Sequence, residues 1–306
     1  MAPVAGNGFL AGAALWIMLQ AGPLPGWENH TAVLLFSLLF LTPLGLSAAR
    51  PAEPPPSHLF RTARFLQIFA ALITAVAFFV APGVLGGTFA VAWLTMTAMT
   101  AIDGLRRFGR DGFSRLEEVL SDLGLIYLFL AALCLWLERM GAPPGGLTAG
   151  ELLFIAARFH IAGCGGLLLA AGLGRRLRAS QQGGFLWLGG ASVLILAAPA
   201  LTALSLLLPG IPGATAELVQ AGGYLGLALA LVFAALPTAT SALVRGSLII
   251  PVMAGLAAAG VSLMAALGGF GDGLVFSAPA LQVLGSWAGC IFVVAGLVAY
   301  PLIRKR

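Results

Sequence analysis

Charged residues are scarce in this sequence. Asp, Glu, Lys and Arg together make up 9% of its 306 residues, whereas 60% are hydrophobic, and the mean hydropathy is +1.01. Soluble domains carry about 25% charged residues, so this composition excludes a soluble globular domain and indicates a polytopic membrane protein. No polar stretch is left over for a second domain, and residues 1–306 are predicted to form a single integral membrane domain.

Cysteine and histidine are also rare, with three of each. Cys134, Cys164 and Cys290 lie in apolar runs without a CxxC pair, which argues against a disulfide framework and against a zinc site. His160 is the only histidine predicted inside the membrane, so bis-histidine haem ligation and multi-histidine di-iron chemistry are excluded. Phosphate-binding loops, HExxH and GxSxG are missing as well. We therefore expect no cofactor and no metal.

Long apolar runs are what the sequence has instead. A helix needs about 20 apolar residues to cross a hydrocarbon core of about 30 Å, and ten runs approach or exceed this length. The predicted fold class is all-α, a polytopic transmembrane helix bundle of about ten spans. The first run has no basic region before it and is predicted to be a retained helix, not a cleaved signal peptide; its short length leaves open whether it crosses completely. The runs are 8–22, 31–49, 63–82, 85–105, 118–138, 150–173, 184–208, 216–237, 247–268 and 280–303.

The basic residues lie almost entirely on one side of the predicted membrane. Cytoplasmic loops carry the Lys and Arg excess, so both termini are predicted to be cytoplasmic, with cytoplasmic loops near 50–62, 106–117, 174–183 and 238–246 and an external loop at 139–149. These topology signals also explain the net charge of +5 and the pI of about 9.7, and nucleic-acid binding is not expected. The 14 of 16 basic residues on that side are Arg50, Arg61, Arg64, Arg106, Arg107, Arg110, Arg115, Arg175, Arg176, Arg178, Arg245, Arg304, Lys305 and Arg306.

Arg158 and His160 lie deep inside the sixth run, which makes them the candidate substrate-binding residues. A charged side chain at that depth is costly and is a functional-site hypothesis by default. At helical spacing Arg158 heads a stripe of small residues, which lets two membrane helices approach closely. His160 points about 200° away from Arg158 around the helix and is expected to be buried. The stripe consists of Ala162, Gly166, Ala170 and Gly174.

Five acids are candidates for supporting roles. Glu151, two turns before the buried arginine on nearly the same helix face, is the leading ion-pair partner, with Glu138 and Glu217 at neighbouring external helix ends as alternatives. Asp103 and Asp122 flank the arginine-rich loop on the cytoplasmic side. As an acid pair they could hold a cation or relay a proton, or they could simply be solvated.

Several segments resemble a known family. LLFLTPLGLSAAR, AVAWLTMTA, LIYLFLAALCLWLERMGAPPGG and LLFIAARFHIAGCGG are similar to segments of the YndJ-like family of uncharacterised bacterial multi-pass membrane proteins, mainly over residues 31–175. His160 matches the second histidine of the family's HFHxAG motif, and Arg158 stands where the first histidine is found. The resemblance implies a multi-pass fold in the bacterial cytoplasmic (inner) membrane, but no mechanism.

Three functions are compatible with the sequence. The favoured one is a small-solute transporter or permease in which Arg158 meets a small anionic or amphipathic solute. The second is a non-catalytic membrane assembly or partner protein, for which the stripe of small residues would suffice. The third is a membrane-embedded enzyme that modifies a lipid or isoprenoid with His160 as acid or base. Membrane lipids are the expected surroundings in each case, and the oligomeric state is left open.

The charge asymmetry makes a testable prediction about topology. A reporter fused after residue 145 and a reporter fused to the C-terminus should lie on opposite sides of the membrane, as measured with paired periplasmic and cytoplasmic reporters. If both fusions report the same side, either the number of spans after residue 145 or the predicted orientation is wrong.

Overall fold

The computed structural model describes residues 30–49, 56–180, 185–208, 210–235, 242–268 and 278–304, and every regular element in these ranges is helical. The elements in chain order are α2 (His30–Phe36), η1 (Ser37–Leu41), α3 (Thr42–Ala48), α4 (His58–Ala77), α5 (Val84–Asp111), α6 (Leu116–Arg139), η2 (Pro144–Gly146), α7 (Ala149–Arg158), η3 (Phe159–Gly166), α8 (Leu167–Ser180), α9 (Phe185–Leu207), α10 (Gly213–Ala235), α11 (Ala242–Gly268) and α12 (Ala278–Arg304). The short η2 is a 3₁₀ turn, whereas η1 and η3 are π-helical.

Within the described residues, nine helices are long and apolar enough to cross a membrane. They coincide with the last nine of the ten predicted runs, which confirms the predicted fold class of an all-α polytopic bundle. The first predicted run, 8–22, lies outside the described residues, as do both chain ends. The count of ten spans and the cytoplasmic location of the termini therefore stay predictions.

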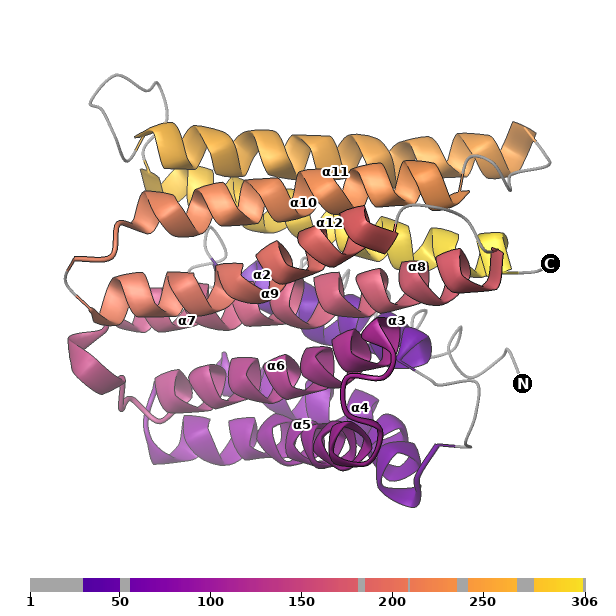
Figure 1. Ribbon diagram of the computed structural model, residues 1–306. Helices are drawn as coiled ribbons and strands as arrows, with labels where there is room; N and C mark the ends of the chain where they lie inside the picture. The colour runs from indigo at the N-terminus through magenta and orange to yellow at the C-terminus, as the bar shows by residue number, and fades with distance from the viewer. Residues whose placement is uncertain are drawn as a thin grey trace.

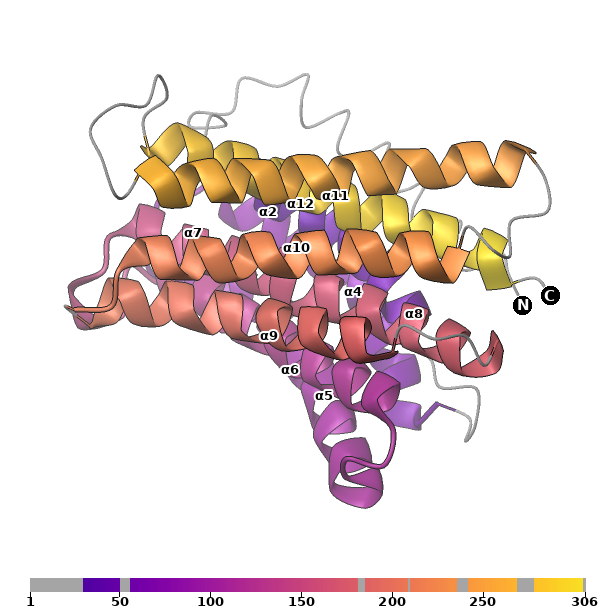
Figure 2. The same ribbon diagram turned by 45° about the horizontal axis from the view of Figure 1, so that its top comes forward.

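The long helices run side by side in one bundle (Figure 1). α4 and α5 lie along one edge, and α10, α11 and α12 lie along the other. Figure 2 shows α9, α10 and α11 as successive neighbours, and α10 contacts both of the others. The span made by α7, η3 and α8 packs between the two groups, since it contacts α6 on one side and α9 and α12 on the other.

This central span has no face left for lipid. Every residue from 152 to 174 is buried, which explains why the segment is apolar on nearly every side. Its start is fixed locally by a capping box, in which the Thr148 side chain accepts a hydrogen bond from the Glu151 amide and the Glu151 carboxylate accepts one from the Thr148 amide. The central span is the element around which the other helices pack.

The two innermost spans each contain a π-helical segment, and these two segments, η1 and η3, contact each other. In η1, side chains add hydrogen bonds to backbone carbonyls. Gln67 Nε2 on α4 donates to the Leu38 carbonyl at 3.0 Å, and Thr42 Oγ1 donates to the Ser37 carbonyl at 3.0 Å, which also accepts the Thr42 amide. Because η3 follows Arg158 directly, it shifts the helical register of everything after it.

That register shift makes the predicted stripe of small residues incomplete. Gly166 does face another helix, since an added Cβ there would lie 2.9 Å from Ile195 Cγ2, but Gly163 and Gly165 lie off the predicted stripe and make equally close approaches. A Cβ on Gly163 would overlap Tyr127, and one on Gly165 would lie 2.7 Å from Val293 Cγ1. The small residues of η3 therefore allow several neighbouring helices, and not only one, to approach closely.

Two predicted cytoplasmic loops are shorter than expected. α5 continues to Asp111 and α6 begins at Leu116, so the predicted loop 106–117 is reduced to a turn in which Gly112, at φ 54°, ends α5. α8 likewise continues to Ser180 through much of the predicted loop 174–183. The high charge density indicated loops, but the charges lie on helix ends, where arginines and acids can pair with one another.

Close packing at η3 makes a prediction about stability. Gly165→Leu should destabilise the bundle by about 1–3 kcal/mol because the added side chain overfills a packed core. Gly260→Leu on α11 is the matched control, since nothing lies within 4 Å of a Cβ at Gly260. Thermal unfolding of the purified variants in detergent measures both changes, and an equal unfolding temperature for the two would contradict the packing described above.

Candidate functional site

A buried ion pair joins the central span to α10. Arg158, the last residue of α7, is 1% exposed, and its Nη2 donates a hydrogen bond to Glu217 Oε1 near the start of α10. The guanidinium carbon also lies 4.8 Å from the centre of the Phe154 ring. A charge in an apolar interior is tolerated when it is paired and hydrogen-bonded. The pair therefore links α7 to α10.

Other polar side chains gather around this pair. On α10, Gln220 and Tyr224 follow Glu217 at helical spacing, and Gln220 Nε2 donates to the Tyr224 hydroxyl at 3.2 Å. Tyr224 lies within electrostatic reach of both charged groups. From α2, the His30 ring packs 4.9 Å from Phe154 and lies within electrostatic reach of the arginine. We call His30, Arg158, Glu217, Gln220 and Tyr224 the Arg158 cluster.

The Arg158 cluster contains polar atoms that lack partners. His30 Nδ1, Arg158 Nε and Nη1, Glu217 Oε2 and Gln220 Oε1 are all buried without a hydrogen-bond partner among the described residues. A buried polar group left in this state costs about 1–3 kcal/mol, and the great majority of such groups in folded proteins have partners. Unpartnered donors and acceptors gathered in one place are what a site for a further polar molecule provides.

His160 lies in a different set of contacts. It is fully buried, its Nε2 accepts a hydrogen bond from Trp93 Nε1 on α5 at 3.2 Å, and its Nδ1 lies 3.0 Å from the Ala156 carbonyl oxygen. Because an indole N–H can only donate, Nε2 must be the acceptor and Nδ1 the donor, which is the neutral tautomer. Both ring nitrogens are therefore occupied. His160 and Arg158 thus have different partners, and a single polar site around both residues stays a prediction.

The three acids predicted as partners of Arg158 have different roles. Glu217 forms the pair. Glu151, the leading candidate, does not, because at the third position of α7 its carboxylate accepts hydrogen bonds from the Thr148 amide and hydroxyl, both at 2.7 Å. Glu138 pairs with its neighbour Arg139. The local backbone at a helix start offers a nearby carboxylate several donors, which the sequence argument for Glu151 left out. A role of these residues in substrate binding stays a prediction.

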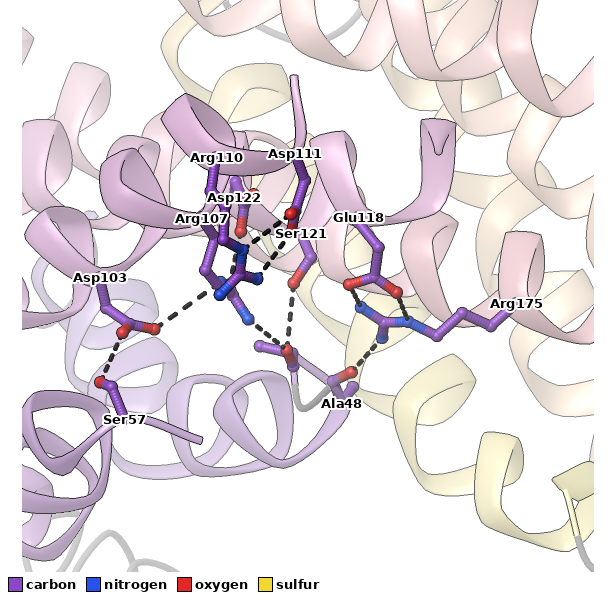
Figure 3. A network of polar contacts seen from close by, with 11 residues as sticks. Ala48, Ser57, Asp103, Arg107, Arg110, Asp111, Glu118, Ser121, Asp122 and Arg175 are labelled. Carbon is purple, nitrogen blue, oxygen red and sulfur yellow. Dashed lines mark hydrogen bonds and ion pairs between the residues drawn. The ribbon is translucent and has the colours of Figure 1, made fainter. Parts of the chain in front are cut away.

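Asp103 and Asp122 do come together, but around an arginine (Figure 3). Arg107 Nη2 lies 2.6 Å from Asp122 Oδ1, and Arg107 Nε lies 3.7 Å from Asp103 Oδ2. Ser57 Oγ donates to Asp103 Oδ1 at 2.5 Å. Both acids are buried, so the expectation that they could simply be solvated is wrong. The described part of the chain contains no group of three or more His, Cys, Asp or Glu side chains placed to hold a metal ion, and a cation or proton role for this pair stays a prediction.

The same end of the bundle is fastened by further hydrogen bonds (Figure 3). Arg175 on α8 binds both carboxylate oxygens of Glu118 on α6, at 2.8 and 2.9 Å, and also donates to the Ala48 carbonyl at 2.7 Å. Ser121 Oγ donates to the Ala49 carbonyl at 3.2 Å. These contacts satisfy carbonyls at the end of α3 and tie α3, α6 and α8 together. We call this set, with the Arg107 contacts, the α8-end network.

Three residues of the Arg158 cluster, His30, Gln220 and Tyr224, were missed by sequence reasoning. His30 lies one residue before the predicted run 31–49, but it is the first residue of α2 and packs in the bundle. Gln220 is uncharged and therefore gave no signal against the apolar run around it. The spacing of Glu217, Gln220 and Tyr224, at i, i+3 and i+7, puts all three on one helix face and could have indicated them.

Comparisons with known proteins give one result. The chain matches the family model described as YndJ-like protein over residues 32–285, which includes both partners of the buried ion pair. The similarity thus reaches well beyond residues 31–175, where the sequence resemblance was strongest. No curated protein and no solved structure matches the chain significantly.

The contacts of His160 predict a structural role that can be measured. Trp93→Phe keeps the ring but removes the donor, so it should leave Nε2 of the histidine unsatisfied and lower the free energy of unfolding by about 1–3 kcal/mol. Trp187→Phe is the control, because Trp187 is 66% exposed. Thermal unfolding in detergent compares the two variants, and equal stability would show that the Trp93–His160 hydrogen bond contributes nothing.

Proposed function

Since the chain belongs to the YndJ-like family and is a multi-pass membrane protein, we propose that it is a small-solute permease whose binding centre is the Arg158 cluster. We place it in the bacterial cytoplasmic membrane, with both termini in the cytoplasm. The observation that supports the proposal is the set of unpartnered donors and acceptors in the cluster, all buried inside the bundle.

The Arg158 cluster reaches from helix ends toward the middle of the bundle. His30 begins α2, and Glu217 follows the start of α10 at Gly213 by four residues, about 6 Å at 1.5 Å per residue. Arg158 follows the start of α7 at Ala149 by nine residues, about 14 Å, which is close to half of a hydrocarbon core of about 30 Å. Solute sites of many transporters lie near the midplane, where helices are interrupted. Here the π-helical η3 begins at the very next residue, and such segments are frequently found at functional sites in α-helices.

The contacts of His160 argue against the enzyme alternative. A general acid or base needs a ring nitrogen that can reach the reacting group, and both nitrogens of His160 are engaged by Trp93 and by the Ala156 carbonyl. A non-catalytic membrane partner is the second candidate. The observation that favours it is the complete burial of residues 152–174, which suits a span that serves packing alone.

An efflux measurement tests the permease. Purified protein is reconstituted in liposomes loaded with a defined mixture of small anions, zwitterions, polyols and sugars, and the solutes retained after dilution are quantified over time by mass spectrometry. We expect at least one of these classes to leave the proteoliposomes faster than protein-free liposomes. Retention equal to that of protein-free liposomes for every class would reject the permease in favour of the partner protein.

Variants of the Arg158–Glu217 pair test whether efflux depends on the Arg158 cluster. Arg158→Met alone should destabilise the protein by about 3–5 kcal/mol, because it leaves the Glu217 carboxylate buried and uncompensated. The double variant Arg158→Met/Glu217→Met removes both charges, so it should recover stability in thermal unfolding while efflux falls to the protein-free level. Glu138→Met/Arg139→Met removes a second buried pair outside the cluster and should leave efflux unchanged. Undiminished efflux in the Arg158/Glu217 double variant would show that the cluster is not part of the transport pathway.

A further inference from the structure

The charges of the Arg158 cluster cancel. Arg158 and Glu217 form a one-to-one pair, and the other members, His30, Gln220 and Tyr224, add no fixed charge. An anionic solute would therefore gain little from this site as a whole, because the carboxylate of Glu217 stands beside the guanidinium that attracts the anion. A cationic solute would be attracted by Glu217 but repelled by the neighbouring Arg158.

The unpartnered atoms are of two kinds. Arg158 Nε and Nη1 can only donate hydrogen bonds, whereas Glu217 Oε2 and Gln220 Oε1 can only accept them. His30 Nδ1 is unpartnered as well and can take either role according to its tautomer. A solute that satisfies the Arg158 cluster must therefore present acceptors toward the arginine and donors toward the two α10 side chains.

We propose that the cluster binds a small zwitterion, with its carboxylate against Arg158 and its ammonium group against Glu217 and Gln220. Such a solute is neutral overall, so it does not disturb the charge balance, and it replaces unpartnered atoms by charge-assisted hydrogen bonds, which are stronger than neutral ones. This inference rests on the proposed function, because it takes the Arg158 cluster as the solute site.

Aromatic rings around the cluster limit the solute to a small one. Phe154 covers one side of the guanidinium, and Tyr224 packs edge-on against Phe292 with ring centres 5.9 Å apart. Tyr224 is also held in place by α12, since a Cβ added to Gly289 would overlap the tyrosine hydroxyl. Because these side chains occupy the space beside the polar atoms, the proposed zwitterion is a small one, such as one of the simplest amino acids.

Ligand-dependent thermal unfolding of the protein in nanodiscs tests the inference. Glycine presents both charged groups, acetate the carboxylate alone, methylammonium the ammonium alone, and glycerol only hydroxyls. At millimolar concentrations and constant ionic strength, glycine should raise the unfolding temperature in a saturating manner, and the other three should not. An equal or larger rise with acetate, methylammonium or glycerol would overturn the proposed zwitterion, and so would the absence of a rise with all four.

A variant that keeps both charges of the Arg158–Glu217 pair tests the proposed binding mode. Gln220→Leu removes one unpartnered acceptor without removing a charge, and it should weaken the apparent affinity for glycine at least tenfold. Glu151→Gln is the control, because this exposed acid caps α7 outside the cluster, and it should leave the affinity for glycine unchanged. Unchanged glycine affinity in Gln220→Leu would overturn the proposed binding mode. Efflux of a class other than zwitterions, with no glycine response, would overturn this inference while supporting the permease.

Discussion

The Arg158–Glu217 pair is the interaction on which the interior of this bundle depends. Moving two opposite charges out of water is expensive, and their mutual attraction offsets that cost only while they stay together. The pair links the central span, which is buried from residue 152 to residue 174, to α10, and α10 in turn packs between α9 and α11. Any shift of α7 relative to α10 along the bundle axis would separate the two charges. The pair therefore constrains the relative position of these helices along that axis.

Arg175 and Arg158 differ in how many of their nitrogens are hydrogen-bonded. Arg175, in the α8-end network, uses three nitrogens, to Glu118 and to the Ala48 carbonyl. Arg158 uses one nitrogen, and two remain without partners among the described residues. Arg107 in the α8-end network also has two buried nitrogens without a hydrogen-bond partner, although its Nη2 lies 2.6 Å from Asp122 Oδ1. The difference between Arg175 and Arg158 supports a structural role for Arg175 and agrees with the binding role proposed for Arg158.

The sequence predicted the helices well because an apolar run of sufficient length is a direct consequence of the bilayer's thickness. It predicted the burial of Arg158, since its neighbours are apolar on every side. It gave the wrong leading partner, because the capping geometry that engages Glu151 depends on how α7 begins. It did not indicate His30, because the proximity of this residue to Phe154 arises from the packing of α2 against α7. Gln220 and Tyr224 share a helix face with Glu217, but neither side chain is charged, so the spacing was overlooked. The sequence did not predict the π-helical segments either, because a change in the hydrogen-bond register of a helix does not alter its amino-acid composition.

The π-helical η3 sets the rotational phase between the two halves of the central span. Arg158 lies just before η3 and faces α10, whereas Arg175 lies after it and faces α6. Each residue of an α-helix turns the chain by about 100°, so the loss or gain of a single residue within η3 would swing one arginine away from its acid while the other stayed in place. The length of η3 is therefore constrained as strictly as the identity of the charged residues. Related chains in which this segment changes length should show a compensating change in where their buried charges lie.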